Sequence, residues 1–489
     1  MKRVVSPDEM HKWDFEQIEK GILATELMLR AAKGLQKAVI RLRKSNETVT
    51  ILCGSGHNGG DGIALACLLQ QQNVPVRLVL LGNLSRITAE SKHYLTLAHS
   101  LNVPLLTKWE PLQNEMLVDA LLGVGLDRPV TGVYANVIEQ VNASGKTILS
   151  ADIPSGLDAN TGEALGIAVR ASETVTMQFY KKGMLLGQGR AFCGAVTVCP
   201  LVTETPFEFE TALFLQEPND LVPLFPPRPF DSHKGKNGHA LLCVGSGRYT
   251  GAALLSARAA LRSGCGILSV CVPNPVRPFF SNLPEAITIP IGTDDWDETG
   301  CRAAISAMDG KAAIGIGCGM GSGEIRSLLY AAIRSRKPLV IDADGLNVLS
   351  ANRDLISMLH SNVVLTPHPG EMARLLNTDI PSILNNPISA AQAFPCTVLL
   401  KGATTVVSDP KRTVLCTEGT PALAKGGSGD VLTGIITALL AQGLGPFDAA
   451  RAGTYLLGTS AKNAYTLLGE RMLLASDVIE AIRMEEHGK

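Results

Sequence analysis

Short apolar runs alternate with helical stretches along this chain, and this alternation constrains the fold more than any other feature. Examples are VTILCG, EMLVDALLG and KTILSADIP in the first half, and HALLCVGSG, GILSVCVP and KPLVIDADG in the second. Strands that are almost continuously apolar, each followed by a helix, are typical of parallel sheets buried on both faces. We therefore predict the α/β class, with two tandem α/β/α domains.

A cluster of prolines divides the two halves. The stretch QEPNDLVPLFPPRPF, residues 216–230, is too rich in proline for a regular helix or a central strand. We therefore predict a first domain over residues 1–213, a linker over 214–230 and a second domain over 231–489. The two halves show no obvious internal repeat, which indicates a fusion rather than a duplication.

The composition is typical of an ordinary cytoplasmic enzyme. Lys and Arg number 44 against 45 Asp and Glu, so we expect no nucleic-acid partner. No apolar run approaches the roughly 20 residues that span a bilayer, and the start of the chain lacks the apolar core of a secretory signal, so we expect no membrane partner. The 11 cysteines form no CxxC pair. We interpret them as reduced core thiols, without structural zinc.

A glycine-rich turn within GTPALAKGGSGDVLTGIITALL, residues 419–440, delivers Asp430 to the start of an apolar helix. Exposed N–H groups in such a turn, together with a helix N-terminus, can hold an anion. An acid at this point can act as a base toward a hydroxyl beside a phosphate. The alternative is a left-handed turn capped by an Asp. The turn resembles the GxGD signature of ribokinase-like phosphotransferases.

A second glycine-rich turn, GSGHNGGDG, follows the apolar run TVTILC in the first half. Its spacing is not that of a dinucleotide-binding motif, but it carries Asn58 and Asp61. Asp119 and Asp152 follow later apolar runs, and the carboxyl ends of parallel strands meet at one edge of a sheet. Oxygen ligands without His or Cys favour Na⁺, K⁺ or Mg²⁺ over a transition metal. Taken singly, Asp119 and Asp152 could instead be helix caps.

The motifs GSGHNGGDG, DALLGVGLDRPV and ADIPSGLDANTG resemble those of the NAD(P)H-hydrate epimerase family, over residues 1 to about 212. That resemblance implies a Rossmann-like parallel sheet, and Asp152 as the group that handles the proton. It places a potassium ion among Asn58, Asp119 and Ser155. It implies contacts with the hydrate from His57, Asn58, Gly59, Gly60, Asp61, Gly123, Val124, Gly125, Leu126, Asp127, Arg128, Pro129, Tyr134 and Asp152. The family usually has Asn where this chain has His57, so the local substrate contact is expected to differ.

The motifs DADGLN, LTPHPGEMARLL, KGATTVV and GTPALAKGGSGDVLTG occur in the order of the ADP- or ATP-dependent NAD(P)H-hydrate dehydratase family, which this half resembles over residues 225–489. The resemblance implies a ribokinase-like domain that takes ADP as co-substrate. It implies nucleotide contacts from Lys401, Gly402, Ala403, Thr404, Thr405 and Gly429, and hydrate contacts from Ala252, Ala253, Gly319, His368 and Asp430. Asp342 and Asp344 end a strand, where they could hold Mg²⁺ through water or cap the sheet end.

Together the two halves resemble the bifunctional hydrate-repair family. The resemblance implies epimerisation of R- and S-NAD(P)H hydrate (NADHX and NADPHX), followed by dehydration of the S form with ADP, giving AMP and phosphate. It also suggests a homo-oligomer. Two alternatives stay open: an ordinary small-molecule kinase in the second half, and a non-catalytic binding module in the first.

Overall fold

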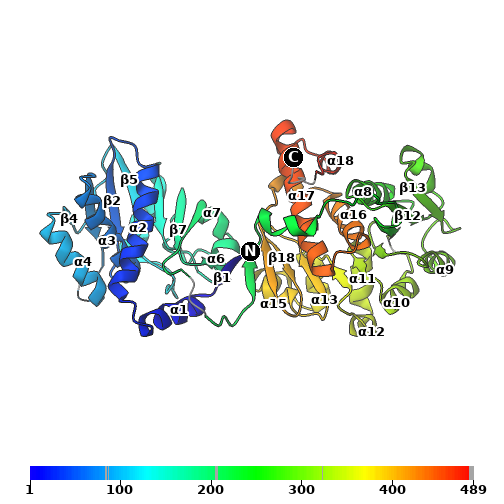
Figure 1. Cartoon of the computed structure of the whole chain (residues 1–489), viewed down its shortest axis with the longest axis horizontal. Helices are drawn as coiled ribbons and strands as arrows, with labels where there is room; N and C mark the ends of the chain where they lie inside the picture. Colours follow the sequence, from blue (N-terminus) through cyan, green and yellow to red (C-terminus); the bar gives the residue numbers. More distant parts are fainter. Residues whose placement is uncertain (83–84, 86, 204–206, 322, 484–489) are drawn as a thin grey trace. The chain divides into compact units, whose positions relative to one another are not determined.

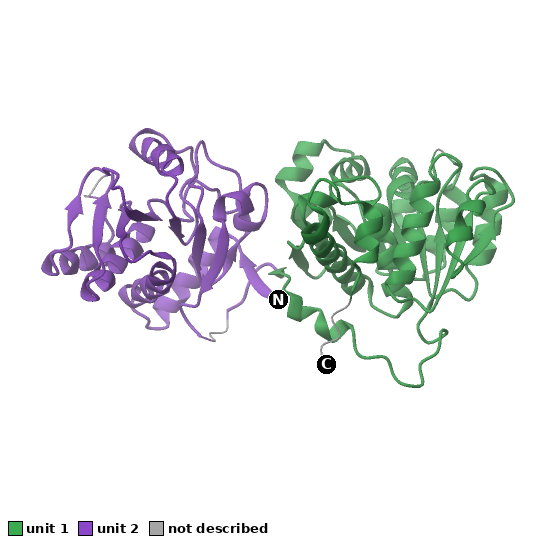
Figure 2. Ribbon diagram, turned by 90° about the horizontal axis from the view of Figure 1, so that it is seen from above, with its two compact units in different colours: residues 1, 212–489 green, residues 2–211 purple. Residues whose placement is uncertain are grey.

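The computed structural model describes residues 1–82, 85, 87–203, 207–321 and 323–483. The chain forms two compact units, one of residues 2–211 and the other of residues 212–489 together with residue 1 (Figure 2). Residues 214–230, which we predicted to be a linker, include part of strand β10 (Leu213–Leu215) and the 3₁₀ helices η2 (Pro218–Asp220) and η3 (Val222–Leu224). The domain boundaries stay a prediction.

The N-terminal unit contains a parallel sheet in the order β4-β3-β2-β5-β6-β7-β9 (Figure 1). The strands are β2 (Thr48–Cys53), β3 (Val76–Leu80), β4 (Leu105–Leu106), β5 (Glu115–Ala120), β6 (Ile148–Ala151), β7 (Glu173–Met177) and β9 (Ala195–Cys199). Its helices are α1 (Pro7–Glu19), α2 (Ala24–Leu42), α3 (His57–Gln71), α4 (Ala89–Ser100), α5 (Gly132–Ala143), α6 (Lys182–Leu185) and α7 (Gly189–Cys193). A separate parallel pair joins β1 (Lys2–Val5) to β8 (Tyr180–Lys181).

Both faces of this sheet are buried, as its apolar strands predict. Alternate residues of β2 belong to different cores: Ile51 and Cys53 pack into one cluster with α2 and α3, whereas Leu52 packs into another with α5. The strand order reverses direction between β2 and β5, because the chain adds β3 and β4 on one side of β2 and then places β5 on the other. A crevice beyond the carboxyl ends of such a strand pair is the usual ligand site of doubly wound sheets.

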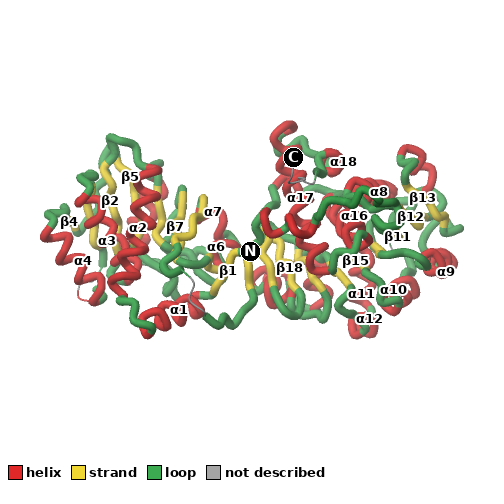
Figure 3. The backbone as a smooth tube through the Cα atoms, viewed as in Figure 1, coloured by secondary structure: helices red, strands yellow, loops and turns green. Residues whose placement is uncertain are grey.

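The C-terminal unit contains a second sheet, with its strands in the order β13-β12-β11-β14-β15-β16-β17-β18-β19-β10. They are β11 (His239–Cys243), β12 (Ile267–Val272), β13 (Ala286–Pro290), β14 (Ala313–Ile316), β15 (Leu339–Ile341), β16 (Val363–Leu365), β17 (Thr397–Leu400), β18 (Thr405–Ser408), β19 (Thr413–Cys416) and β10. The helices of this unit are α8 (Thr250–Arg262), α9 (Glu298–Ala307), α10 (Arg326–Arg334), α11 (Ala343–Ala351), α12 (Arg353–Ser357), α13 (Pro369–Leu376), α14 (Ile380–Asn385), α15 (Pro387–Ala391), α16 (Ser428–Ala441), α17 (Pro446–Leu468) and α18 (Ala475–Glu480). Figure 3 shows strands of this sheet in yellow among helices in red.

The predicted fold class is confirmed, with one difference in detail. From β13 to β17 the neighbouring strands run parallel, but β18 is antiparallel to both β17 and β19. The short connections on either side of β18 allow hairpins but leave no room for a crossover helix. The antiparallel strand β18 is a detail that the prediction of parallel strands did not include.

Helix α16 is buried along its length, from Val431 to Ala441. It packs closely on α8, since a Cβ added at Gly434 would lie 2.1 Å from the carbonyl oxygen of Ser256. Through this packing α16 presents its N-terminal turn, with Asp430, at the sheet end. The cysteines are all free and buried, as predicted. Among the described residues, no helix is both long and apolar enough to cross a bilayer.

Candidate active sites

The glycine turn of the N-terminal unit brings the start of α3 onto the end of β2. A Cβ at Gly59 would lie 2.0 Å from the carbonyl oxygen of Gly54, so only glycine fits there. This approach fixes Asn58, which is buried and donates from Nδ2 to the carbonyl oxygen of Leu122 at 2.9 Å. Its Oδ1 is also buried but has no hydrogen-bond partner among the residues that the structure describes. A buried acceptor without a partner is costly, so this atom indicates a ligand.

Asp119 and Ser155 meet Asn58 around the backbone of Leu122. The Asp119 carboxylate accepts hydrogen bonds from the Ser155 N–H at 2.9 Å and from the Ser155 hydroxyl at 2.5 Å. The Ser155 hydroxyl oxygen also lies 2.8 Å from the Leu122 nitrogen and 3.1 Å from its carbonyl oxygen. Burial raises the pKa of Asp119, while these hydrogen bonds oppose the rise. The structure therefore brings together the three residues predicted to hold potassium and adds one backbone carbonyl.

Asp152 follows β6 in the left-handed backbone region, with φ at 62°. A non-glycine residue in this region carries strain, which is often found at functional sites. Its carboxylate accepts from the N–H of Met177 at 2.9 Å and forms an ion pair with Lys181. The Lys181 side chain is fully buried and also donates to Thr176 and to the Met177 carbonyl, each at 2.9 Å.

Lys181 was not among the site residues predicted from the sequence. Its only signal was a lysine directly after an apolar run, and this weak signal gains meaning only when Asp152 lies beside it. The three ammonium protons of Lys181 are all used in contacts with Asp152, Thr176 and Met177. Lys181 therefore fixes the orientation of the Asp152 side chain.

Two further acids interact with this ion pair. Burial and the Asp152 charge raise the pKa of Asp61, on α3, well above its usual range. The same two causes raise the pKa of Asp14, on α1, to about 7. Lys181 partly offsets both shifts. Asp14 was also absent from the predicted site.

The other residues predicted to contact the hydrate differ in their burial and in their partners. Tyr134 donates to the carbonyl oxygen of Leu81, just after β3, at 3.1 Å. The His57 side chain is 79% exposed, and its Nε2 lies 3.9 Å from a Glu90 carboxylate oxygen. Part of the loop 123–129, residues 124–127, lines a cavity of about 220 Å³ with residues 158–160 and with Pro7, Asp8 and His11 of α1.

In the C-terminal unit, Asp342 is the centre of a buried polar group. It caps α11 through the N–H of Ala343 and accepts from Lys401 Nζ, each at 2.8 Å. Its other oxygen accepts from the Thr433 hydroxyl of α16, also at 2.8 Å. Burial opposes the charge on Lys401, but Asp342 and Glu371 outweigh it and raise the Lys401 pKa. Both Asp342 oxygens are engaged, which favours the capping role over the alternative of Mg²⁺ binding through water.

Asp430 lies in the first turn of α16, just beyond the left-handed Gly427. Burial, followed by the charge of Asp342, raises the pKa of Asp430 to about 6. The next glycine places the helix start against the polar group, because a Cβ at Gly429 would lie 3.5 Å from Lys401 Nζ and 3.6 Å from Asp342 Oδ2. A carboxylate poised near neutral pH beside an ammonium suits proton transfer next to a phosphate.

The remaining predicted residues lie at neighbouring strand ends. A Cβ at Gly319, after β14, would lie 2.7 Å from the Ala252 Cβ, and Ala253 follows in the same buried turn of α8. His368 caps α13 with its Nδ1, which lies 3.0 Å from the Gly370 nitrogen, and its side chain is half exposed. Gly402, Ala403 and Thr404 connect β17 to β18, which begins at Thr405.

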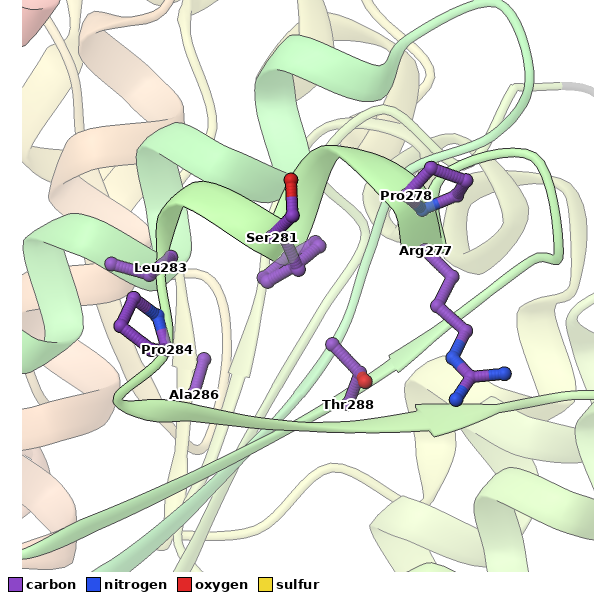
Figure 4. Close-up of a pocket in the computed structure, with 8 residues that line it drawn as sticks. Arg277, Pro278, Ser281, Leu283, Pro284, Ala286 and Thr288 are labelled. Carbon is purple, nitrogen blue, oxygen red and sulfur yellow. The ribbon is translucent and has the colours of Figure 1, made fainter.

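A larger cavity of about 420 Å³ lies elsewhere in this unit, between the 3₁₀ helix η4 (Arg277–Asn282) and β13. Figure 4 shows Leu283 and Pro284 at one end of this space and Arg277 at the other. None of its lining residues belongs to either predicted site. Its size alone therefore assigns it no function.

The two units thus have different chemical sites, each beyond the carboxyl ends of parallel strands. One carries a lysine-bound carboxylate beside a set of oxygen ligands, and the other carries a phosphotransferase-type acid at a glycine-rich helix start. This arrangement defines a two-site α/β enzyme, one half of which has the features of a phosphotransferase.

Comparisons with known proteins identify the class further. A family described as NAD(P)H-hydrate dehydratase matches residues 240–483, and one described as YjeF-related protein N-terminus matches residues 24–183. The bifunctional NAD(P)H-hydrate repair enzyme of Coxiella burnetii is 34% identical over 483 residues and covers 96% of each chain. That of Thermofilum pendens is 34% identical, over 93% of this chain and 91% of the relative.

One solved structure is similar to the C-terminal half. It is the ADP/ATP-dependent NAD(P)H-hydrate dehydratase of Bacillus subtilis, co-crystallised with ATP and Mg²⁺. It is 29% identical, covers 55% of this chain and 96% of its own, and superposes with a TM-score of 0.48. The near full-length matches establish the family: this chain belongs to the bifunctional NAD(P)H-hydrate repair enzymes. The predicted family and enzyme class are therefore confirmed, and neither the simple kinase nor the binding module is supported.

Proposed function

We propose that the N-terminal unit interconverts the R and S epimers of hydrated NADH and NADPH, and that the C-terminal unit dehydrates the S epimer with ADP. The observation that carries this proposal is the presence of two separate acid sites, in units that match two different families. Epimerisation supplies the only form that the dehydratase uses. One chain would then repair the whole hydrate pool.

Epimerisation requires proton transfer at the hydrated ring. Water added across the C5–C6 bond leaves a hydroxyl on C6, which is also bonded to N1. Removal of the hydroxyl proton allows the C6–N1 bond to break, with its electron pair moving to N1, and reclosure on the other face of C6 inverts the centre. Asp152 is the base in this scheme, because Lys181 and the Met177 N–H contact its carboxylate and fix its orientation.

The oxygen atoms near Asp152 fit a potassium ion. Asn58 Oδ1 has no partner among the described residues, and the Leu122 carbonyl links Asn58 to the Ser155 hydroxyl, which donates to Asp119. Oxygen ligands with a single carboxylate suit a large monovalent cation. Potassium bound by Asn58, Asp119 and Ser155 would supply a fixed positive charge beside the substrate.

Dehydration requires the C6 hydroxyl to become a good leaving group. Asp430 takes the hydroxyl proton while the oxygen attacks the terminal phosphorus of ADP and the bond to AMP breaks. The C5 proton then leaves, the C6–O bond breaks with its electrons on phosphate, and the C5–C6 double bond of NAD(P)H returns. The glycine N–H groups before α16 and the Lys401 ammonium are placed to stabilise charge on the transferring phosphate.

We assign the nucleotide to residues 401–405 and Gly429, and the hydrate to Ala252, Ala253, Gly319 and His368. Lys401 supports this assignment, because Asp342 and Glu371 fix its ammonium at the start of α16. Mg²⁺ would neutralise the nucleotide phosphates, with Asp344 as the nearby carboxylate. Asp344 also accepts from the Gly321 N–H at 2.8 Å, so it is positioned by the same loop that carries Gly319.

A homo-oligomer is proposed on the family resemblance alone. A cytoplasmic location, without nucleic-acid or membrane partners, is proposed because the chain carries 11 free, buried thiols and balanced charge. Reduced thiols are typical of a reducing compartment.

The proposed function is tested by the absorbance of the reduced nicotinamide ring. Purified protein, Mg²⁺ and S-NADHX should regenerate NADH only when ADP is added, with AMP and phosphate formed in equal amounts. ATP in place of ADP tests the nucleotide preference. Accumulation of a stable phosphorylated product, without return of the absorbance, would show a kinase instead of a dehydratase.

A further inference from the structure

Helix α1 lies outside the motifs from which the epimerase site was predicted. It precedes the residues that the N-terminal family matches, which begin at residue 24. Pro7, Asp8 and His11 of this helix line the cavity of about 220 Å³ opposite the loop 124–127. This loop belongs to the segment to which we assign the hydrate, so α1 closes that region.

Asp14 lies further along the same helix. Residues 7, 11 and 14 have the i, i+4, i+7 spacing of one helical stripe, so Asp14 lies on the same side of α1 as the cavity-lining Pro7 and His11. Two contacts fix α1 beside the segment that carries Lys181. Trp13 packs edge-on against Phe179, with ring centroids 5.6 Å apart, and Val5 of β1 is paired in register with Lys181.

The ring-opening scheme needs an acid as well as a base. Asp152 accepts the hydroxyl proton, but N1 must gain a proton as the C6–N1 bond breaks. Lys181 cannot readily supply it, because its side chain is fully buried and its three protons contact Asp152, Thr176 and Met177. Asp14 is only partly buried, so its carboxyl can reach a bound molecule.

We propose that α1 forms one wall of the epimerase site and that Asp14 is the acid that acts opposite Asp152. The proposal rests on the epimerase function proposed above. Asp14 donates its proton to N1 as the ring opens, and rotation about the C5–C6 bond exposes the other face of the aldehyde. Reclosure returns the N1 proton to Asp14 and the proton on Asp152 to the oxygen, so all atoms and charges balance.

The charged groups around Asp14 are consistent with this role. Asp61 faces it from α3, Asp152 from the end of β6 and Lys181 from β8, while His11 lies one turn earlier on α1. Burial, followed by the charges of Asp152 and Asp14, raises the pKa of Asp61 well above its usual range. The Asp14 pKa of about 7 matches that of an efficient acid at neutral pH.

The test uses the full chain with K⁺ and without ADP, so that the dehydratase is silent. Separated R-NADHX is incubated with protein, and conversion to the S form is followed chromatographically over roughly pH 5 to 9, after subtraction of the rate without protein. Wild-type kcat should fall as the pH rises through about 7, where Asp14 loses its proton. Asp14→Asn should lower kcat by about 10²-fold and abolish this fall, with little change in KM.

Asp14→Glu should restore part of the rate and the pH dependence. Glu16→Gln, on the same helix at a side chain that pairs outward with Lys20, is the matched control and should behave as wild type. Wild-type kcat and pH dependence in Asp14→Asn would overturn the inference and leave the epimerase assignment intact. A wild-type profile without a fall near pH 7 would also overturn it, even if the Asn variant did not fold. Absence of any epimerisation by the wild type would overturn both.

Discussion

At the scale of single residues, the chain places its two key carboxylates in different electrostatic settings. Asp152 is held by a fully buried ammonium and a backbone N–H, which fix it as an oriented carboxylate. Asp430 lies near Asp342, and burial together with this like charge raises its pKa to about 6. One carboxylate is paired with a buried ammonium, whereas burial and a neighbouring carboxylate raise the pKa of the other toward neutral pH.

The raised pKa of Asp430 predicts how the rate of dehydration depends on pH. A base works only when ionised, so kcat should rise as the pH passes through about 6 and reach a plateau above it. Asp430→Asn should lower kcat by roughly 10²–10⁴-fold, because shape and polarity stay while the proton acceptor is lost. NADH regeneration from S-NADHX and ADP measures both effects. Unchanged turnover in this variant would show that Asp430 is only a helix cap.

Folding stability gives an independent check on Asp430. The folded pKa of about 6 lies above the ordinary value of 3.8, so the folded protein binds this proton more tightly and loses stability as the pH rises from 3.8 through 6. At pH 7 the full penalty is present. Asp430→Asn should therefore melt at the same temperature as wild type or higher, and ADP binding through residues 401–405 should survive.

The ion pair between Lys181 and Asp152 gives a prediction for the N-terminal unit. Lys181→Met should abolish measurable epimerisation and destabilise the N-terminal unit by about 3–5 kcal/mol, because a largely buried carboxylate loses its counter-charge. The adjacent Lys182→Met is the matched control, since Lys182 makes no contact with Asp152 among those the described residues form. Epimer interconversion and thermal melting are the measurements. Equal loss in both variants would contradict the assigned role.

At the scale of elements, glycines decide how closely helix starts approach strand ends. Gly59 and Gly434 both face a backbone carbonyl at a distance that no side chain tolerates. The first positions Asn58 at the end of β2, and the second positions α16 on α8. The sites therefore depend on backbone packing that lies outside the reacting groups.

Gly59→Ala tests this dependence. Its Cβ would lie 2.0 Å from the Gly54 carbonyl oxygen, so α3 must shift and carry Asn58 with it. Epimerisation should fall at least about tenfold, with a loss of stability of about 1–3 kcal/mol. Gly56→Ala, in the same turn, meets no atom within 4 Å and should cost little of either. Wild-type K⁺ response and rate in Gly59→Ala would refute the proposed coupling between this glycine and the site.

Much of the fold and part of each site could be predicted from sequence, for physical reasons visible in particular residues. Alternating apolar runs predicted the sheets, acids placed directly after them predicted Asp119 and Asp152, and a glycine-rich turn before an apolar helix predicted Asp430. Lys181 and Asp14 were missed because their importance depends on contacts between distant segments. The antiparallel β18 was missed because a short apolar run does not encode strand direction.

At the scale of the whole molecule, one chain carries two sites that catalyse different reactions. The first site changes only the configuration at C6, and the second removes the hydroxyl from one configuration. A single substitution in the full chain should therefore inactivate one site and leave the other active. Neither substitution touches the core of the other unit, because the residues belong to different compact units.

The recovery of NADH from an equal mixture of R- and S-NADHX tests this division most directly. With ADP and Mg²⁺, the wild type should return all of the hydrate to NADH. Asp152→Asn should return the S half quickly and the rest only at the uncatalysed rate of epimerisation, while Asp430→Asn should return almost none. Mixing the two variants should restore full recovery. If Asp152→Asn alone recovers both epimers at the wild-type rate, or if the mixture recovers no more than Asp152→Asn alone, the two-site account is wrong.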